Sequence, residues 1–395
     1  MIAKKINLII YLGIVLIIGC AIYNVNSNLY IKTAVGRFYL IQKEQFLRKI
    51  NKRFYKLPVP LNYIKPTILN HKITNPASWV TLQIEKDFSN FSNASVYNVI
   101  HTFESLPPSA LLVLFTIKNG KLSVTKKNNY SLDQASERGV YIYSNIFSYI
   151  AEHGYVKNLS FLLRFSDYFT DPIPYLTSEI APILTTSKDL KRDIDQNLIL
   201  IPDYMSLEDI PKFMPKIRMA SYIYHWKAKE NKICWRGGQA DVSGFRKSIV
   251  EYSEQHPHSI IDAKFVVEKN NFMHPEFQLK YKLLLNIDGH TAAWTRPIWQ
   301  LQSNSVMVKQ NSQLTQWYYA ALVPDIHFIS VDPDPVAVIN KINSYTDEEL
   351  YKIAKNGSEF AENNLTINDM VAYITLVLQK YENLQHSHNT KSILN

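Results

Sequence analysis

Cysteine is scarce in this 395-residue chain, which contains only Cys20 and Cys234. A zinc site built from cysteines needs more of them, so the count excludes that class of site. A domain of this size in an oxidising compartment usually carries disulfides, and their absence favours a reducing compartment. Internal repeats and low-complexity tracts are also lacking, while 46% hydrophobic and 19% charged residues are typical of globular proteins. We therefore expect one large domain or, as the length favours, two medium-sized ones.

Acidic residues are outnumbered, because 34 Asp and Glu stand against 43 Lys and Arg, for a net charge of +9. Such an excess can drive nucleic-acid binding. Much of it, however, lies in one run from Lys32 to Lys56, where Glu44 is the single acidic residue. We interpret this run as attracted to anionic lipid, with a solvated helix face as the alternative, and we expect no nucleic-acid partner.

The N-terminal segment combines length with a lack of charge. Residues 6–31 contain no Asp, Glu, Lys or Arg, and about 20 apolar residues suffice to cross a bilayer as a helix. We predict a single-pass transmembrane helix and membrane anchor over residues 1–31, followed by a basic juxtamembrane helix and linker over 32–66. A signal peptide is the alternative, although no small-residue cleavage site follows. The basic residues close to the two ends of this segment nearly balance, and both orientations stay open. If the more distant basic residues also count, we expect the soluble part on the cytoplasmic face of a bacterial inner membrane.

Short apolar runs in the remaining sequence predict an α/β fold. We expect strands at 111–117, 159–165 and 198–201 in the first half, with a helix over 132–153. In the second half we expect strands at 233–235, 283–287, 306–308 and 327–331, with helices over 246–256 and 297–302. A strand, helix, strand order is typical of a parallel sheet. The proline-rich stretch 204–216 is interpreted as a connection, which gives domains over 67–210 and 211–385 and a tail over 386–395.

Two further helices are predicted near the C-terminus. Thr346 and Glu349 have the spacing of a capping box, in which each side chain bonds the other residue's backbone N–H. After Thr366, apolar residues recur at three- and four-residue spacing, which predicts a helix with one buried face. The members of that stripe are Ile367, Met370, Val371, Ile374, Leu378 and Tyr381.

Two clusters of glycine and arginine each follow a predicted strand. The first contains Arg236, Gly237 and, a few residues later, Arg246. The second contains Gly289 and Arg296. Glycine allows backbone N–H groups to approach a phosphate, and arginine can bond two phosphate oxygens at once. A surface turn with exposed arginines fits each cluster equally well when it is considered alone.

Taken together, these clusters and their surroundings resemble a known family. The matching residues, in order, are Trp235, Arg236 and Gly237; Ile261, Asp262 and Ala263; Lys280, Tyr281 and Lys282; Asn286 and Gly289; Ala292, Ala293 and Arg296; Trp317 and Tyr318; Leu322, Pro324 and His327. Upstream, Arg164, Asp167 and Tyr168 match a strand that ends in an Asp-Tyr pair. The pattern resembles the lipopolysaccharide-modifying and capsule-associated glycosyltransferases of glycosyltransferase family 90, which also includes the protein O-glucosyltransferases.

The resemblance implies a GT-B-type glycosyltransferase with two Rossmann-like domains facing a cleft, in which 67–210 is the acceptor side and 211–385 binds the nucleotide sugar. It implies inverting, metal-independent transfer of glucose, xylose or a similar sugar from a UDP-sugar donor to a lipopolysaccharide or other surface glycan acceptor. A protein O-glucosyl- or xylosyltransferase and a catalytically silent glycan- or nucleotide-binding homologue are the alternatives. Asp167 is the expected catalytic base, with Asp171 as competitor, and a turn-capping role remains open for both.

On the donor side, the resemblance assigns a set of binding residues and no cofactor beyond the donor itself. This set comprises Trp235, Arg236, Gly237, Arg246, Asp262, Asp288, Gly289, Thr295 and Arg296. Arg236, Arg246 and Arg296 are expected to neutralise the charge on the leaving diphosphate, the task that a metal performs elsewhere. The acidic pairs Asp193 with Asp195 and Asp332 with Asp334 are a metal-binding alternative, but their places do not fit the metal-binding motif of other transferases. We therefore expect no metal.

Overall fold

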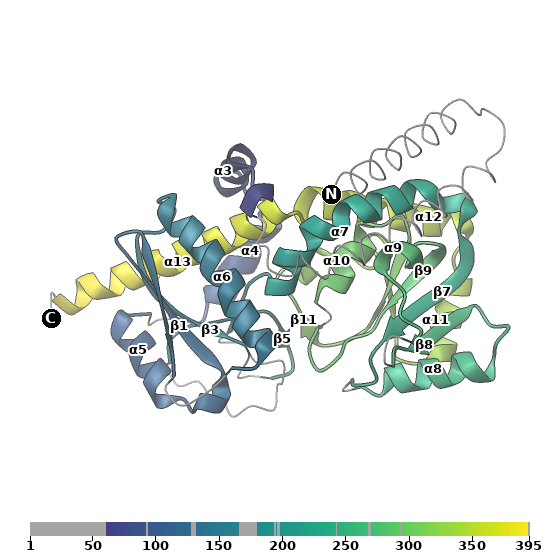
Figure 1. The fold of residues 1–395 in the computed structure, drawn as a ribbon, viewed down its shortest axis with the longest axis horizontal. Helices are drawn as coiled ribbons and strands as arrows, with labels where there is room; N and C mark the ends of the chain where they lie inside the picture. Colours follow the sequence, from purple (N-terminus) through teal and green to yellow (C-terminus); the bar gives the residue numbers. More distant parts are fainter. Residues whose placement is uncertain are drawn as a thin grey trace, which may run out of the picture. The chain divides into compact units, whose positions relative to one another are not determined.

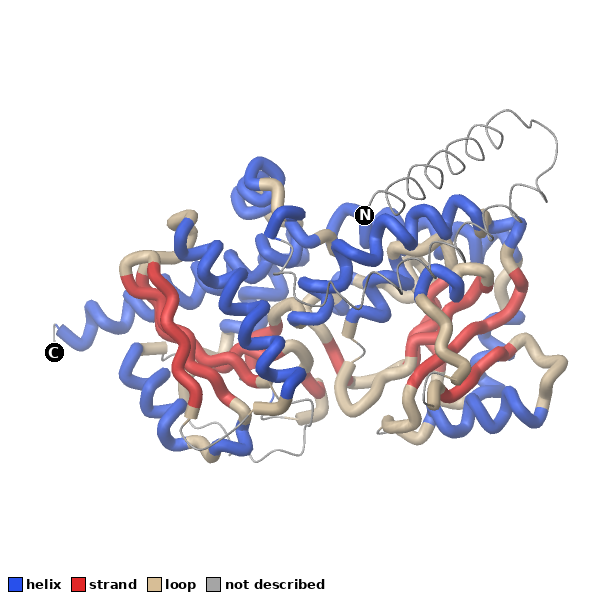
Figure 2. Tube along the Cα trace, viewed as in Figure 1, coloured by secondary structure: helices blue, strands red, loops and turns tan. Residues whose placement is uncertain are grey.

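The computed structural model describes residues 61–91, 94–127, 132–165, 180–192, 195, 198–241, 243–267, 270–292 and 294–393, with side chains to residue 386. The predicted anchor and most of the predicted juxtamembrane segment lie outside these residues. Within the described ranges no helix is both long and apolar enough to span a membrane. Apart from Tyr222–His225, the described residues belong to one compact unit. This unit contains both large sheets, which appear in red in Figure 2.

The first sheet has the strand order β2-β1-β3-β4-β6. Its strands are β1 (Leu112–Lys118), β2 (Lys121–Lys126), β3 (Asn158–Arg164), β4 (Ile183–Thr185) and β6 (Leu198–Leu200). Three are within two residues of the predicted strands, but β1 and β3 are antiparallel rather than parallel. The reason is the unpredicted hairpin to β2, which turns at Asn119 and Gly120, both with positive φ. The helix α6 (Gln134–Glu152) therefore connects β2, not β1, to β3.

Helices cover the first sheet (Figure 1), and aromatic side chains pack between sheet and helix. Before β1 come α3 (Pro66–Thr74), α4 (Ser78–Phe88) and α5 (Val96–Ser105), none of which was predicted. The ring of Phe147 on α6 meets those of Phe115 on β1 and Phe161 on β3, with both centroid distances at 5.0 Å. This aromatic packing fixes α6 on the sheet and thus helps to fix where β3 ends.

The stretch after β6 is a helix and not the predicted proline-rich connection. Helix α7 (Tyr204–Ile223) includes Pro211 and Pro215. Asp203 caps its start by accepting the backbone N–H of Ser206 at 2.8 Å. Leu207, Ile210 and Ile217 are among the buried residues that line its length. Capping and burial outweigh the cost of the two prolines, and the predicted boundary at residue 210 falls within this helix.

The second sheet is entirely parallel, with strand order β12-β10-β9-β7-β8. Its strands are β7 (Glu230–Gly237), β8 (Ile261–Phe265), β9 (Tyr281–Asn286), β10 (Val306–Gln310) and β12 (Ile329–Val331). All but β8 were predicted, and the α/β class with parallel strands is confirmed. The helices between these strands are α8 (Phe245–Gln255), α9 (Pro275–Gln278) and α10 (Thr295–Leu301), and β12 is followed by α11 (Pro335–Asn343) and α12 (Asp347–Asn364). Alternate strand residues fill the core, including Ile233 with Trp235 and Leu283 with Leu285.

The order of these strands creates a switch point. From β7 the chain moves to β8 on one side, and then returns to β9 on the other side of β7. In open parallel sheets, the two connections at such a point diverge and ligands bind outside the carboxyl ends of the two strands. The carboxyl ends of β7 and β9 are therefore the place where this sheet is expected to bind a ligand.

The C-terminal helices confirm their predictions. In α12 the capping box is present, because Thr346 accepts the backbone N–H of Glu349 and Glu349 accepts that of Thr346. All six apolar positions predicted for the next helix are buried. This helix, α13 (Ile367–Ile393), packs against the first sheet (Figure 1), where Gln385 bonds the backbone of Ser160 in β3 in both directions, each at 3.0 Å.

A small sheet joins the halves of this unit. Strands β5 (Lys188–Asp189) and β11 (Leu314–Thr315) form a two-stranded antiparallel sheet. These two strands follow the carboxyl ends of β4 in the first sheet and β10 in the second. Within the first half, Lys188 also forms a buried ion pair with Asp87 of α4, with 2.6 Å between Nζ and Oδ1.

Candidate active site

Four of the predicted binding elements converge at the carboxyl edge of the second sheet. Strand β7 ends in Arg236 and Gly237, and β9 is followed by the turn that contains Gly289. Arg246 lies in the first turn of α8, and Arg296 lies in the first turn of α10. Because parallel strands end at one edge and the following helices begin there, residues about 60 positions apart in the sequence are brought together.

Arg296 is a partly buried cation whose hydrogen bonding is incomplete. Its Nη2 donates to the carbonyl oxygen of Arg236 at 2.6 Å. Its Nη1 is closed off from solvent and has no hydrogen-bond partner among the described residues. Burial, with the nearby charge of Arg246 adding to it, lowers the pKa of Arg296 to about 10. The guanidinium therefore stays protonated at neutral pH, and a buried charge of this kind favours a bound anion.

Arg246 is held by backbone carbonyls rather than by a carboxylate. Its Nη1 donates to the carbonyl of Ala240 at 2.8 Å, and its Nη2 donates to that of Ile287 at 3.2 Å. The guanidinium carbon lies 5.7 Å from the ring of Trp235. Burial lowers the pKa of Arg246, and the charges of Asp241 and Asp288 partly oppose this shift. Within the described part of the chain, neither Arg246 nor Arg296 lies within ion-pair distance of a carboxylate.

Gly289 leaves room for this guanidinium. A Cβ on Gly289 would lie 3.1 Å from Nη2 of Arg246, which is closer than such contacts normally allow. A side chain at this position would therefore press on Arg246. The prediction that Gly289 permits close approach is consistent with this geometry, although the approaching group is a protein side chain.

Arg236 has a different environment from the other two arginines. Its Nη2 pairs with the carboxylate of Asp262 on the neighbouring strand at 2.7 Å, and the arginine is 6% exposed. Burial raises the pKa of Asp262, but the hydrogen bond from Tyr281 and the charge of Arg236 outweigh it, so the pKa is lowered overall. Asp262 therefore compensates Arg236, whereas Arg246 and Arg296 have no ion-pair partner within the part of the chain that the structure describes.

The other predicted donor-side residues lie at or near the carboxyl edge of the second sheet. The side chain of Trp235 points into the hydrophobic core, and a Cβ on Gly237 would lie 2.6 Å from its indole. Thr295 is the first residue of α10. Asp288 is 3% exposed, and its carboxylate lies 3.6 Å from Nζ of Lys309.

Lys309 and Gln310 were not among the predicted site residues. They end β10, one strand from Asp288, and the side-chain oxygen of Gln310 accepts the backbone N–H of Asp288 at 3.2 Å. Their position was available in the sequence, because two polar residues directly follow the apolar run 306–308 at the same edge of a predicted parallel sheet. Polar residues that follow a strand of a parallel sheet lie at its ligand-binding edge, and this rule applies to Lys309 and Gln310 as it does to the two arginine clusters.

Loops from the first sheet contact the loop that follows β9. The hydroxyl of Ser187, beyond β4, accepts the backbone N–H of Ala292 at 3.3 Å and donates to the carbonyl of Thr315 at 3.2 Å. The ring of Tyr204, at the start of α7, lies edge-on to that of Trp294 with 5.4 Å between centroids. Segments beyond the carboxyl ends of strands in both sheets therefore meet beside Arg296.

The predicted base, Asp167, and its competitor Asp171 lie outside the described residues. Strand β3, which leads to them, is confirmed as far as Arg164. Of the carboxylates in the metal-binding alternative, Asp334 caps α11 by accepting the N–H of Ala337 at 2.7 Å, and Asp195 accepts that of Asp189 at 2.7 Å. The base assignment stays a prediction.

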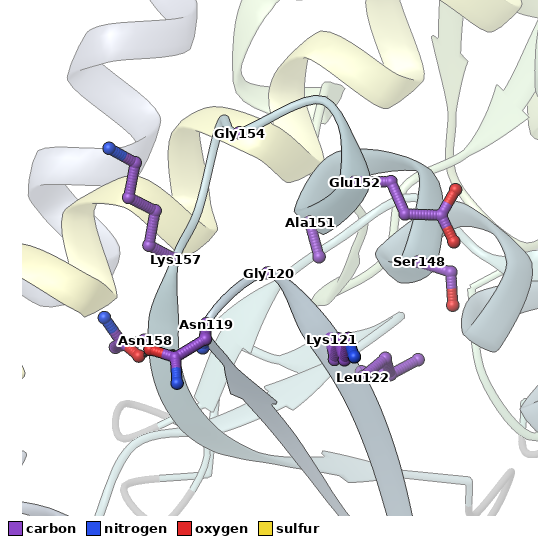
Figure 3. Close-up of a pocket in the computed structure, with 10 residues that line it drawn as sticks. All are labelled: Asn119, Gly120, Lys121, Leu122, Ser148, Ala151, Glu152, Gly154, Lys157 and Asn158. Carbon is purple, nitrogen blue, oxygen red and sulfur yellow. Dashed lines mark hydrogen bonds between the residues drawn. The ribbon is translucent and has the colours of Figure 1, made fainter.

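Two cavities are present elsewhere, and the arginines at the sheet edge line neither of them. One, with a volume of about 760 Å³, lies at the turn between β1 and β2 and beside Asn158 at the amino end of β3 (Figure 3). It is thus at the opposite end of β3 from the residues that lead to Asp167. The other, of about 550 Å³, lies beside the carboxyl end of β10.

Comparison with known proteins identifies relatives of this chain. Residues 75–393 match the model of glycosyl transferase family 90. Protein O-glucosyltransferase 2 of Danio rerio is 30% identical over 48% of this chain and 41% of its own length. Protein O-glucosyltransferase 3 of Homo sapiens is 30% identical over 41% of this chain and 34% of its own length. The matched parts thus span less than half the length of either relative.

Among solved structures, a sucrose-phosphate synthase from Thermosynechococcus elongatus matches 54% of this chain and 59% of its own, with 11% sequence identity and a TM-score of 0.27. A TM-score of this size does not assign a fold. The family match, by contrast, extends over most of the chain and includes both sheets and all of the arginines discussed above. The protein therefore belongs to glycosyl transferase family 90.

Proposed function

We propose that the protein transfers a sugar from a UDP-sugar to an acceptor hydroxyl with a GT-B arrangement of two Rossmann-like halves, without a metal and with inversion at the anomeric carbon. The observation that carries this proposal is the pair of guanidiniums, Arg246 and Arg296, which lie at the switch point of the second sheet and have no carboxylate partner among the described residues. Two adjacent cations suit the two phosphates of a nucleoside diphosphate.

The proposed mechanism uses these cations where negative charge develops. The acceptor oxygen attacks the anomeric carbon from the side opposite to UDP, the bond to the diphosphate oxygen breaks, and Asp167 takes the proton of the acceptor hydroxyl. Arg246 and Arg296 stabilise the charge that grows on the leaving diphosphate. Arg236 positions Arg296 through its carbonyl oxygen and is itself neutralised by Asp262.

The names of the relatives make UDP-glucose the first donor to test, followed by UDP-xylose. For the acceptor, we propose a lipopolysaccharide or other surface glycan, reached from a membrane anchor on the cytoplasmic face. A protein hydroxyl is the second candidate, favoured by two relatives that are protein O-glucosyltransferases. Because those relatives are matched over less than half of their length, their acceptor does not transfer to this chain by similarity alone.

Turnover separates an active enzyme from a silent homologue. We expect the purified full chain to release UDP from UDP-glucose or UDP-xylose, with GDP-mannose as the control donor, and to do so in the presence of a chelator. Release should rise when a suitable acceptor is added, because the acceptor competes with water for the anomeric carbon. Binding of donor with no release under any condition would support the silent homologue instead.

A matched pair of glycine variants tests the close approach at Arg246. In Gly289→Ala the new methyl group lies within 3.1 Å of Nη2 of Arg246 and displaces the guanidinium, whereas the same change at Gly238 meets nothing within 4 Å. We expect kcat/KM for the donor to fall about threefold to tenfold in Gly289→Ala, as for a misplaced electrostatic contact. Gly238→Ala should match the wild type. Equal kinetics for both variants would show that the position of Arg246 is unimportant for the donor.

A further inference from the structure

The cavity beside the carboxyl end of β10 has two walls from different parts of the chain. One wall comes from α4 and from β5 with the turn that follows it, and the other comes from β10, β11 and the segment that leads to β12. Its volume of about 550 Å³ is within the range of small-molecule sites, about 300–1,000 Å³. Neither the predicted donor residues nor any comparison assigns a ligand to it.

Three charged side chains in this cavity already have protein partners of opposite charge. Lys188 and Asp87 form their ion pair with side chains that are 7% and 3% exposed. Asp87 also accepts the backbone N–H of Leu200 at 2.9 Å. Lys309 faces Asp288 at 3.6 Å and lies 4.8 Å from the ring of Tyr319. Since these buried charges have partners, an ionic ligand would gain little from them, and a neutral ligand fits this part of the cavity.

Apart from Lys86, Asp189, Arg192 and Asp195, the remaining lining combines neutral polar groups with apolar surface. Asn90, Asn311 and Ser312 supply amide and hydroxyl groups, while Leu190, Leu322 and Tyr319 supply apolar surface. Leu190 is 57% exposed, so its side chain is accessible to a ligand. A pyranose presents hydroxyl groups around its edge and C–H groups on its faces, so this mixture suits a sugar ring.

The cavity also lies close to the donor-side edge. Lys309 lines it and reaches Asp288 in the loop after β9, and Thr315 lines it and is bonded by Ser187, which also accepts the N–H of Ala292. We propose that this cavity binds one or two neutral pyranose units of the acceptor. The assignment as an acceptor site depends on the proposed function, whereas saccharide binding in the cavity does not.

The test places a large side chain in the cavity and compares this variant with one that has the same substitution at a distant surface position. Asn311, an exposed residue on the cavity wall, becomes Trp in the first variant, and Asn343, an exposed residue at the end of α11, becomes Trp in the control. Saturation-transfer NMR measures binding of cellobiose, maltose and lactose to the full chain. We expect at least one disaccharide to bind the wild type and Asn343→Trp, and to bind Asn311→Trp about tenfold more weakly or worse.

A calorimetric titration of UDP on the same three proteins reports on the proposed function separately. UDP affinity should be equal in all three, which also shows that each variant is folded. Absence of disaccharide binding to the wild type, or undiminished binding to Asn311→Trp, overturns the inference while leaving the donor site intact. Failure of the wild type to bind UDP contradicts the proposed function without affecting the saccharide result.

Discussion

Replacing Arg296 by alanine should lower kcat/KM for the sugar donor by about 10²-fold to 10³-fold, as does the loss of one strong donor to a developing negative charge in other enzymes. Arg296 offers an Nη1 that has no partner among the described residues, and its guanidinium is protonated at neutral pH. The loss should appear in kcat as well as in KM, because the charge on the diphosphate grows as the glycosidic bond breaks. Steady-state kinetics with UDP-glucose measure it.

Arg296→Lys provides the matched control for charge. A lysine keeps the positive charge but lacks the planar fork that reaches both the carbonyl of Arg236 and a phosphate. We expect Arg296→Lys to fall between the wild type and Arg296→Ala. Thermal unfolding of Arg296→Ala should be close to that of the wild type, because Arg296 has no carboxylate partner among the residues that the structure describes and its removal relieves repulsion with Arg246. Wild-type kinetics in Arg296→Ala would exclude this residue from the diphosphate site.

Replacing Asp262 by alanine should cost about 3 kcal/mol of unfolding free energy, at the lower end of the range for breaking a buried ion pair. The change leaves Arg236, which is 6% exposed, without its counter-charge. The lower end applies because the Asp262 side chain is 22% exposed, so water can partly replace it. Urea unfolding measures the loss as a lower midpoint with an unchanged slope.

Two further variants separate charge from hydrogen bonding at this pair. Tyr281→Phe removes one hydrogen bond to Asp262 and should cost about 1 kcal/mol. The double variant Arg236→Met with Asp262→Leu should recover much of the stability lost in Asp262→Ala, because no buried charge is left unpaired. If the double variant still binds UDP, the clamp consists of Arg246 and Arg296. A stability loss below about 0.5 kcal/mol in Asp262→Ala would contradict the pairing.

The parts of the fold that depend on local pattern could be predicted from the sequence. The strands near Ile233, Leu283 and Val306 are short apolar runs, and their parallel pairing places the loops after them at one edge. That rule was enough to bring Arg246 and Arg296 together. The capping box at Thr346 was also predictable, because it involves only residues three positions apart.

The parts that depend on pairing between distant segments could not be predicted in this way. The hairpin at Gly120 reverses the chain before α6. For this reason β1 and β3 are antiparallel, whereas the sequence predicted a parallel pair. The ion pair between Arg236 and Asp262 requires knowledge that β7 and β8 are neighbours, and β8 was not predicted as a strand. In the sequence, an arginine that binds the diphosphate looks the same as an arginine in a structural ion pair. The two can be told apart only when the neighbouring strand is known.

A calorimetric titration of UDP in the presence of a chelator, with the wild type and with the double variant Arg246→Ala and Arg296→Ala, tests the central claim most directly. The claim is that these two guanidiniums, without a metal, bind the diphosphate at the switch point of the parallel sheet. We expect the wild type to bind UDP and the double variant to bind about 10²-fold more weakly or not at all, since each contact to a charged group contributes about 1.5–3 kcal/mol. Equal affinity in the two proteins, or binding by the wild type only when a divalent cation is added, would contradict it.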